Sequence, residues 1–315
     1  MTDEAAASLL GTSRAQTEPR AIWRVHPIAL LVVLTAVWGV TFVQVKDAVA
    51  LYPLFAFLAL RFAIASCTLA PPGLRRLRTL GAGGVRAGAL AGSLLAAGYV
   101  LQTAGLQRTS VSSAGFITGL QVVLTPLIAV ALFRVRIGVL AWAGVGVATI
   151  GLALLSGVHG GSVVGDLLVL AGAAGFALQI ALMERYARRY DAIAFTLVEM
   201  LAAFAGLALL AAVLGELRIP HGWTVWGALV VTGVFASALG FLAQTWAQRR
   251  ATAMQTALVF TVEPVWTAFF GFMLAGDRLG PVAWLGCVLI MAGVSTAEPV
   301  AAAVLVRLAR WPRPA

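Results

Sequence analysis

The fold is decided by the stretch from Trp246 to Gly293, which reads WAQRRATAMQTALVFTVEPVWTAFFGFMLAGDRLGPVAWLGCVLIMAG. It consists of two apolar runs separated by the polar segment Gly276-Asp277-Arg278, and the first run carries Glu263-Pro264 near its middle. A carboxylate within an apolar run is costly in lipid, so it usually faces protein or a water-filled cavity. Proline removes a backbone donor and kinks or weakens its helix. We therefore expect two membrane helices here, the first of them broken beside a functional site.

The rest of the chain is built from runs of the same kind. Hydrophobic residues make up 61% of the 315 residues and charged residues 11%, which excludes an ordinary soluble domain. Ten apolar runs of about 17–24 residues are each long enough to cross a bilayer as a helix. The sequence therefore predicts an all-α membrane protein with ten transmembrane helices, at residues 27–46, 52–70, 87–106, 113–133, 138–156, 166–183, 192–214, 224–246, 254–275 and 281–297.

The distribution of positive charge predicts how the chain is oriented. Of the 22 Lys and Arg residues, seventeen lie in tails and loops on the side of the N-terminus, four lie on the opposite side, and Arg61 lies within a span. Basic loops stay in the cytoplasm, so we expect a protein of the cell inner (plasma) membrane with both termini cytoplasmic. The net charge of +10 is then an orientation signal, and no nucleic-acid partner is expected. Residues 1–26 are predicted to form a disordered cytoplasmic tail and residues 299–315 a basic cytoplasmic tail.

The two halves of the chain repeat each other. Segment 136–144 matches segment 278–286 at its Arg, Ala, Trp and both Gly positions, and Gly151 then matches Gly293. Five spans per repeat is an odd number, so the second half must enter the membrane upside down. Inverted repeats typically hold a substrate site near the midplane, between the halves. The predicted repeats are residues 27–156 and 157–298, each with five transmembrane helices.

Two further correspondences place candidate residues in the repeats. Thr125-Pro126 falls in the first half where Glu263-Pro264 falls in the second, so Pro126 and Pro264 are both expected to break their helices. Arg61 and Glu199 fall at the same place in the second and seventh spans. Two interpretations of this pair stay open. The two side chains can form a structural ion pair, since unpaired charges in lipid are costly, or they can share in substrate recognition, with Arg61 meeting a carboxylate and Glu199 an amine.

The pattern resembles a known family. The EamA family of the drug/metabolite transporter superfamily has similar residues in the same order, namely Trp38-Gly39-x-x-Phe42, Arg61-Phe62, Ala-Gln-Arg-Arg before the ninth span, Glu263-Pro264-Val-Trp, and the Trp284/Gly286/Gly293 spacing. The resemblance covers nearly the whole chain after residue 27 and includes the duplication. It implies ten helices, a central cavity, and export of amino acids, metabolites or xenobiotics. One departure concerns the acidic residue that such proteins often carry after the fourth span; here that loop is Arg134-Val-Arg136, so any role for the acid rests on Asp277.

Glu263 also has two interpretations. In one, it is a structural carboxylate that is protonated or bonded to a neighbouring helix and stabilises the break at Pro264. In the other, it lines the cavity and binds a cationic or amine substrate, or a proton, as a proton-coupled exporter requires.

Uncharged polar and aromatic residues complete the candidate set. Trp38 can line the cavity or pack in the core. Gln102, Gln121 and Gln179 can hydrogen-bond between helices or face water in a cavity. Glycines at 84, 88 and 92 form a stripe that permits close helix packing.

No catalytic motif stands out. The three histidines lie far apart in predicted tails or loops, and the sequence holds neither a His-Glu-x-x-His zinc pair nor a Gly-x-x-x-x-Gly-Lys-Ser/Thr phosphate loop. We therefore expect no enzyme, no metal, no cofactor and no built-in ATPase.

The predicted function is that of an inner-membrane secondary transporter, surrounded by membrane lipid, that exports a small metabolite, amino acid or drug-like compound by alternating access. A proton is the candidate coupling ion, and the sequence does not define an oligomeric state. Spans one to four and six to nine are expected to line the cavity, with spans five and ten at the periphery. The alternative is a non-transporting membrane sensor or assembly factor.

Overall fold

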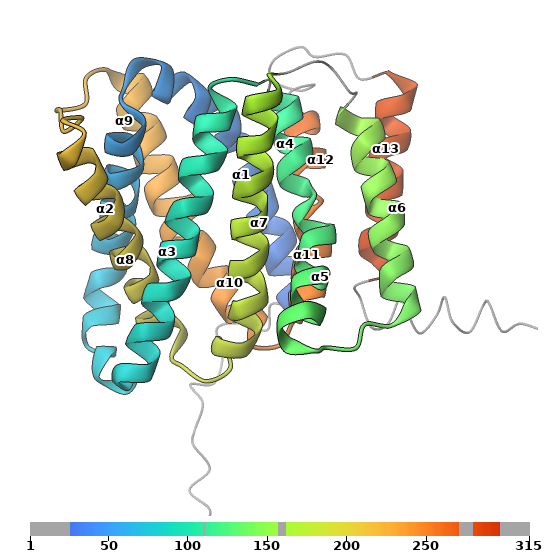
Figure 1. The fold of residues 1–315 in the computed structure, drawn as a ribbon, viewed down its shortest axis with the longest axis horizontal. Coiled ribbons are helices and arrows are strands. Elements are labelled where there is room, and N and C mark those ends of the chain that lie inside the picture. Colours follow the sequence, from blue (N-terminus) through green and yellow to red (C-terminus); the bar gives the residue numbers. More distant parts are fainter. Residues whose placement is uncertain (1–25, 110, 157–161, 271–279, 297–315) are drawn as a thin grey trace, which may run out of the picture.

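The computed structural model describes residues 26–109, 111–156, 162–270 and 280–296, and within these ranges every regular element is a helix (Figure 1). Most are α-helices, η1 is a 3₁₀-helix and η2 is a π-helix. In chain order the elements are α1 (Pro27–Leu51), α2 (Leu54–Leu74), η1 (Leu77–Thr79), α3 (Gly81–Leu106), α4 (Val111–Gly119), α5 (Gln121–Phe133), α6 (Val139–Ser156), α7 (Val163–Tyr186), α8 (Ala192–Val213), α9 (Trp223–Val230), η2 (Val231–Leu239), α10 (Gly240–Gln248), α11 (Ala253–Phe260), α12 (Glu263–Phe270) and α13 (Pro281–Ser295).

Seven helical units within these ranges are long and apolar enough to cross a membrane. They are α1, α2, α3, the α4–α5 unit, α7, α8 and the unit of α9, η2 and α10, and they coincide with seven of the ten expected spans. Helices α6 and α13 are apolar but shorter. The ninth expected span contains α11 and α12 and continues into residues 271–279, which lie outside the described ranges. An all-helical membrane fold is thus confirmed, while the full set of ten spans stays a prediction.

Several sequence predictions fall outside the described ranges. They concern residues 1–25 of the N-terminal tail, residues 157–161 between the predicted repeats, Asp277, and the C-terminal tail at 299–315.

The helices of the two halves pack against each other rather than forming separate bundles. Helix α3 packs on both α7 and α8, α2 packs on α8, and α6 packs on α13. The α6–α13 pair lies at one end of the long axis of the molecule (Figure 1). The core therefore lies between the halves, where a site shared by both can form.

Glycines allow α6 and α13 to approach closely. A Cβ atom on Gly151 would lie 2.7 Å from the carbonyl oxygen of Gly286, and one on Gly286 would lie 2.6 Å from that of Gly151. Gly144 and Gly293 face each other in the same way, at 3.0 and 2.6 Å. The contacts run in opposite directions along the two helices, so these are antiparallel. In the sequence match Gly144 corresponds to Gly286 and Gly151 to Gly293. Each glycine therefore contacts the counterpart of the other glycine on its own helix. This exchange of partners is typical of equivalent elements related by a two-fold axis.

The glycine stripe of α3 has the packing role that was predicted for it. A Cβ atom on Gly88 would lie 2.9 Å from Cγ1 of Val198, and one on Gly92 would overlap the carbonyl oxygen of Glu199. Both neighbours belong to α8. The stripe therefore brings the backbones of α3 and α8 together beside Glu199.

The two expected helix breaks differ. In the second half, α11 ends at Phe260 and α12 begins at Glu263. Pro264 is then the second residue of α12, where a helix needs no backbone donor. In the first half, Pro126 lies inside α5, and the interruption falls at Leu120 instead. The prediction of a break at Pro126 is therefore wrong. A membrane helix packed among others tolerates proline because its neighbours can satisfy the freed backbone group.

Candidate functional site

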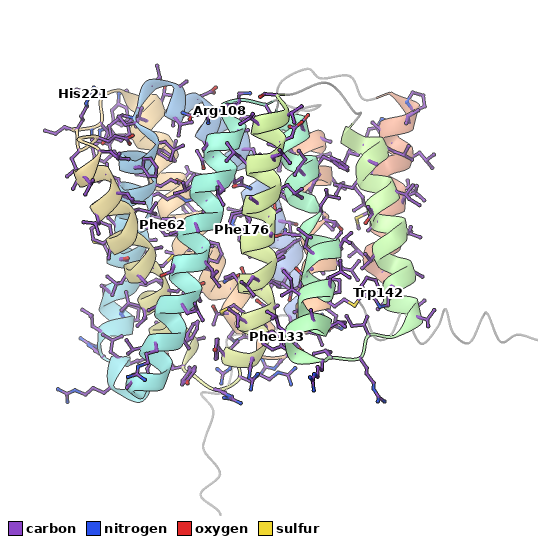
Figure 2. All side chains as sticks on the ribbon, viewed as in Figure 1. Phe62, Arg108, Phe133, Trp142, Phe176 and His221 are labelled. Atoms are coloured by element: carbon purple, nitrogen blue, oxygen red, sulfur yellow. The ribbon has the colours of Figure 1, made fainter. Side chains whose placement is uncertain are left out.

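A cavity lies between the two halves. Its walls come from α1, α2, α3, the α4–α5 unit, α7, α10, α11 and α12, and it encloses about 660 Å³ of empty space up to and including its opening. Phe176 lines the cavity and lies about half-way up the bundle, whereas Arg108 lies towards one end and Trp142 towards the other (Figure 2). Within the described ranges α6 and α13 contribute no residue to the lining, which fits the peripheral place expected for spans five and ten.

Six of the seven residues predicted to bind substrate or to couple its movement line this cavity. The seventh, Glu199, does not line the cavity but is hydrogen-bonded to a residue that does. Nε2 of Gln179 donates to its Oε1 atom over 2.8 Å. The six lining residues are Trp38, Arg61, Gln102, Gln121, Gln179 and Glu263.

Glu263 is the first residue of α12, lines the cavity and is 8% exposed as a whole residue. A carboxylate is favourable at this position because the helix dipole is positive there. Thr267 fixes the local backbone, since its single Oγ1–H shares one hydrogen bond between the carbonyl oxygen of Glu263 and that of Gly39 on α1, each 3.1 Å away. Within the described residues no side chain bonds or pairs with the Glu263 carboxylate. The described part of the structure thus holds the backbone of Glu263 in place and engages neither of its carboxylate oxygens.

Arg61 is a buried cation held by hydroxyl groups. Its Nε atom donates to Oγ of Ser237 over 2.8 Å, and its Nη2 atom donates to the Tyr99 hydroxyl over 3.0 Å. The guanidinium carbon lies 4.2 Å from the centre of the Tyr99 ring, a cation–π distance. No carboxylate pairs with Arg61 in the described part of the chain, so the ion pair with Glu199 does not form in this structure. Helix α2 turns Arg61 towards η2 and α3, whereas Glu199 faces α7.

Glu199 ends a line of buried amide groups, which we call the amide chain (Gln179, Gln244 and Gln248). Nε2 of Gln244 donates to Oε1 of both Gln179 and Gln248, each over 3.0 Å. Gln248 in turn donates to the carbonyl oxygen of Ile180 over 3.0 Å. Oε2 of Glu199 and Oε1 of Gln244 are buried and have no hydrogen-bond partner among the described residues. The amide chain therefore runs from the cavity wall to the end of α10, next to the basic pair at 249–250.

Trp38 is both a cavity wall and a structural anchor, so its two interpretations hold together. Its indole Nε1 atom donates to the carbonyl oxygen of Ala236 over 2.9 Å. The ring centre lies 5.5 Å from that of Phe241 and 4.8 Å from that of Phe260. The cavity is thus aromatic on the side facing α10 and α11.

Two predicted glutamines differ in how they are engaged. Gln102 donates to Oγ1 of Thr118 over 2.9 Å and so joins α3 to α4. Gln121 is 4% exposed and lines the cavity, and its amide has no hydrogen-bond partner among the described residues. Gln121 is therefore the amide best placed to meet a ligand.

Sequence reasoning missed Tyr99, Ser237 and the backbone of Ala236. Tyr99 could have been found, because it precedes Gln102 by three residues and so shares its helix face. The other two depend on η2, a nine-residue π-helix inside the span Trp223–Gln248. Helices of this type occur often at functional sites, yet nothing in the apolar pattern of the sequence distinguishes η2 from α-helix.

Comparisons with known proteins agree with this description. The profile of the EamA-like transporter family matches residues 26–157 and again residues 163–297. A protein of Archaeoglobus fulgidus described as an uncharacterized transporter is 31% identical over 266 residues, which cover 84% of this chain and 83% of that protein. A solved crystal structure superimposes with a TM-score of 0.71 at 20% identity, covering 90% of this chain and 97% of the other.

The apolar helices define a multi-pass membrane protein, and a cavity lies between its two halves. The chain belongs to the EamA-like transporter family, which is part of the drug/metabolite transporter superfamily, and it is a membrane transporter.

Proposed function

We propose that this transporter is a secondary exporter of small molecules that carry an amine or other cationic group. It works by alternating access across the inner membrane, with both termini in the cytoplasm. The observation that carries the proposal is the Glu263 carboxylate, which is buried, faces the cavity and has no partner among the described residues. A buried charge without a protein partner is costly, so a cationic group of the cargo is its natural complement.

A proton is the proposed coupling ion. Export requires that Glu263 release its cargo after the cavity changes sides, and a carboxylate releases a cation when it takes up a proton instead. Arg61 is the second charge in the cavity, and its other contacts are to hydroxyl and aromatic groups. A cargo with both an amine and a carboxylate can therefore meet Glu263 with one end and Arg61 with the other.

Two features support alternating access by two inverted halves. The crossed glycine contacts between α6 and α13 are those expected for equivalent helices related by a two-fold axis. The amide chain lies between the cavity and the end of the molecule that carries the basic pair at 249–250, which we call the basic end. None of its members is exposed. It is thus a candidate seal for the cytoplasmic side, which would open when the halves rock against each other.

The proposal is tested by export of candidate cargoes from cells and then from proteoliposomes. Strains that overexpress or lack the protein are first challenged with amino acids, amines and toxic analogues. A compound that overexpression protects against is then loaded into proteoliposomes that contain wild-type protein, Glu263→Gln or Asp47→Asn. Asp47 is an exposed carboxylate near the end of α1 and serves as the matched control.

We expect Asp47→Asn to transport like wild type and Glu263→Gln to lose most transport and its dependence on the proton gradient. Transport by Glu263→Gln at the wild-type rate, with the same response to pH, would return Glu263 to a structural role. Cargoes that are all anionic would contradict the proposed substrate class.

A further inference from the structure

A second hollow, which we call the groove, lies on the surface of the bundle between α1 and the unit of η2 and α10. It encloses about 1270 Å³ of empty space up to its open side. Val33 is 62% exposed and Phe235 is 52% exposed, so the groove opens towards the surrounding lipid. Its apolar walls come mainly from Leu30, Val33, Val37, Phe235, Leu239 and Ala243.

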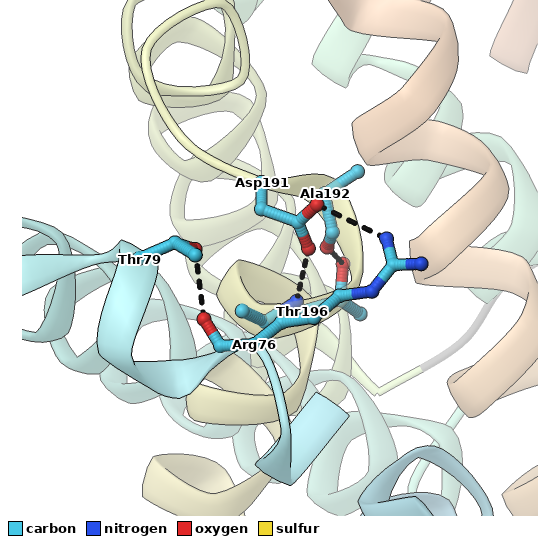
Figure 3. Close-up of polar contacts among 6 residues, drawn as sticks. Arg76, Thr79, Asp191, Ala192 and Thr196 are labelled. Carbon is cyan, nitrogen blue, oxygen red and sulfur yellow. Dashed lines mark hydrogen bonds and ion pairs between the residues drawn. The ribbon is translucent and has the colours of Figure 1, made fainter. Parts of the chain in front are cut away.

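One end of the groove is charged. Arg76, Asp191 and Arg249 line it there, beside the indole of Trp246. Both oxygen atoms of Asp191 are engaged, Oδ1 by the backbone N–H of Ala194 over 3.0 Å and Oδ2 by Nη1 of Arg76 over 3.2 Å (Figure 3). The side chain of Arg249 is exposed and has no bonding partner among the described residues. This end therefore carries one positive charge in excess.

The groove has the length of one leaflet. The apolar lining of the groove runs from Phe235 in η2 to Trp246 in α10, which is about 16 Å at about 1.5 Å per residue. Half of the hydrocarbon core of a bilayer is about 15 Å thick. Trp246 sits beside the arginines, at the level where tryptophan marks the boundary between hydrocarbon and headgroups. An apolar channel of one-leaflet length that ends in an unpaired guanidinium matches a lipid with a negative headgroup.

We propose that the groove binds one anionic phospholipid, with an acyl chain along α10 and its phosphate at Arg249 and Arg76. Basic pockets between membrane helices bind such headgroups. A second protein chain is a poorer fit, because the charge is confined to one end of the groove and the rest is apolar. The proposal does not depend on the cargo or on the direction of transport.

A lipid in the groove would also pack against the side chains that form the cavity wall. Gly240 lines the groove, and a Cβ atom placed on it would lie 2.9 Å from Cδ1 of Leu34 and 3.3 Å from Nε1 of Trp38. Leu34 lines the groove and Trp38 lines the cavity, so a single layer of side chains separates the two.

The test measures lipid binding to the purified full-length protein. Wild type, Arg249→Gln and Arg75→Gln are delipidated and mixed with phosphatidylglycerol, phosphatidylcholine or glycerol phosphate. Bound lipid is counted by native mass spectrometry, and thermal unfolding is followed in parallel. Arg75 is the matched control because it is exposed, lies next to Arg76 and does not line the groove. Ala243→Trp fills the apolar part of the groove and leaves both arginines intact.

We expect wild type and Arg75→Gln to retain one phosphatidylglycerol and to unfold at a higher temperature when it is present. Arg249→Gln should bind it about fivefold more weakly, the effect of one basic group near a headgroup, and Ala243→Trp should lose it. Equal binding of phosphatidylcholine, an equal loss in Arg75→Gln and Arg249→Gln, or full stabilisation by glycerol phosphate alone would each overturn the proposal. Unchanged binding in both Arg249→Gln and Ala243→Trp would do the same.

Discussion

At the scale of single residues, replacing Gly92 by alanine tests how tightly α3 and α8 pack. A Cβ atom there would overlap the Glu199 carbonyl oxygen and lie 2.9 Å from Cβ of Ala202. We therefore expect Gly92→Ala to destabilise the protein by about 1–3 kcal/mol, the usual cost of overpacking. Gly146→Ala is the control, because a Cβ atom there would have no neighbour within 4 Å. Thermal unfolding in detergent checks this, and equal midpoints for the two variants would show that α3 and α8 can move apart freely.

Arg61 gives a second prediction at this scale. Because it bonds to Ser237 and Tyr99 and not to Glu199, Arg61→Gln strands no carboxylate. We expect near wild-type abundance, and loss of transport for cargoes that carry a carboxylate. Western blotting and the proteoliposome assay measure the two quantities. A large drop in abundance that Glu199→Gln restores would show instead that the two side chains pair in another state of the protein, since breaking a buried pair costs about 3–5 kcal/mol.

The residues of the cavity were largely predictable from sequence, but their partners were not. Glu263, Arg61 and Gln121 are polar groups in apolar runs, which marks them without any alignment or structure. Their partners depend on how each helix is rotated about its axis and on which helices are neighbours. One of the two interpretations of the repeat was that Arg61 would pair with Glu199, yet Arg61 instead donates to the hydroxyl of Ser237.

At the scale of elements, the amide chain predicts a mutation that opens the basic end. Gln244→Leu keeps the size of the side chain and removes both of its hydrogen bonds to Gln179 and Gln248. Ile180 lines the cavity, and we expect a cysteine placed there to be labelled faster. The impermeant thiol reagent is added on the side of the membrane that the basic end faces. The background replaces Cys67 and Cys287 by serine.

Gln255→Leu is the matched control for the Gln244 variant. Gln255 lies in the capping box of α11 and is not part of the amide chain. An increase in labelling of the same size in both variants, or none in Gln244→Leu, would contradict a sealing role for the amide chain.

Sequence periodicity located whole helices but did not predict the irregularities within them. The apolar runs located α1, α2 and α8 to within a few residues. The interruption at Leu120 and the π geometry of η2 were not predicted. Neither alters the apolar pattern, so hydropathy does not record them. Proline was a misleading guide at position 126, because a membrane helix packed among others tolerates it.

At the scale of the whole molecule, the prediction is the topology. With Cys67 and Cys287 replaced by serine, we expect a cysteine at Arg75 to be protected from an impermeant reagent in intact cells and one at His221 to react. The reason is the excess of Lys and Arg on the side of the N-terminus. Inside-out vesicles should give the reverse pattern. Reaction at Arg75 in intact cells would invert the assignment of both termini to the cytoplasm.

The architecture was predictable at this scale because the length and hydropathy of a segment largely determine whether it inserts into a membrane. Length, hydropathy and the spacing of Trp142, Trp284 and their glycines indicated a duplicated helical protein, and the family profile matches both halves. Which helices would touch was not encoded so plainly. The close contact of α3 with α7 and α8, for example, became evident only from the three-dimensional structure.

The π-helix η2 has a consequence for how cargo specificity can change. Its nine residues wind more slowly than an α-helix because each turn holds more residues. It therefore sets the angular phase of α10, and with it the direction in which Phe241 and Gln244 point. Each residue of an α-helix advances by about 100°, and each residue of η2 advances by less. Gaining or losing one residue while η2 keeps its π geometry would rotate α10 by somewhat less than 100°, so an insertion or deletion here would present a new set of side chains to the cavity without a single substitution within it.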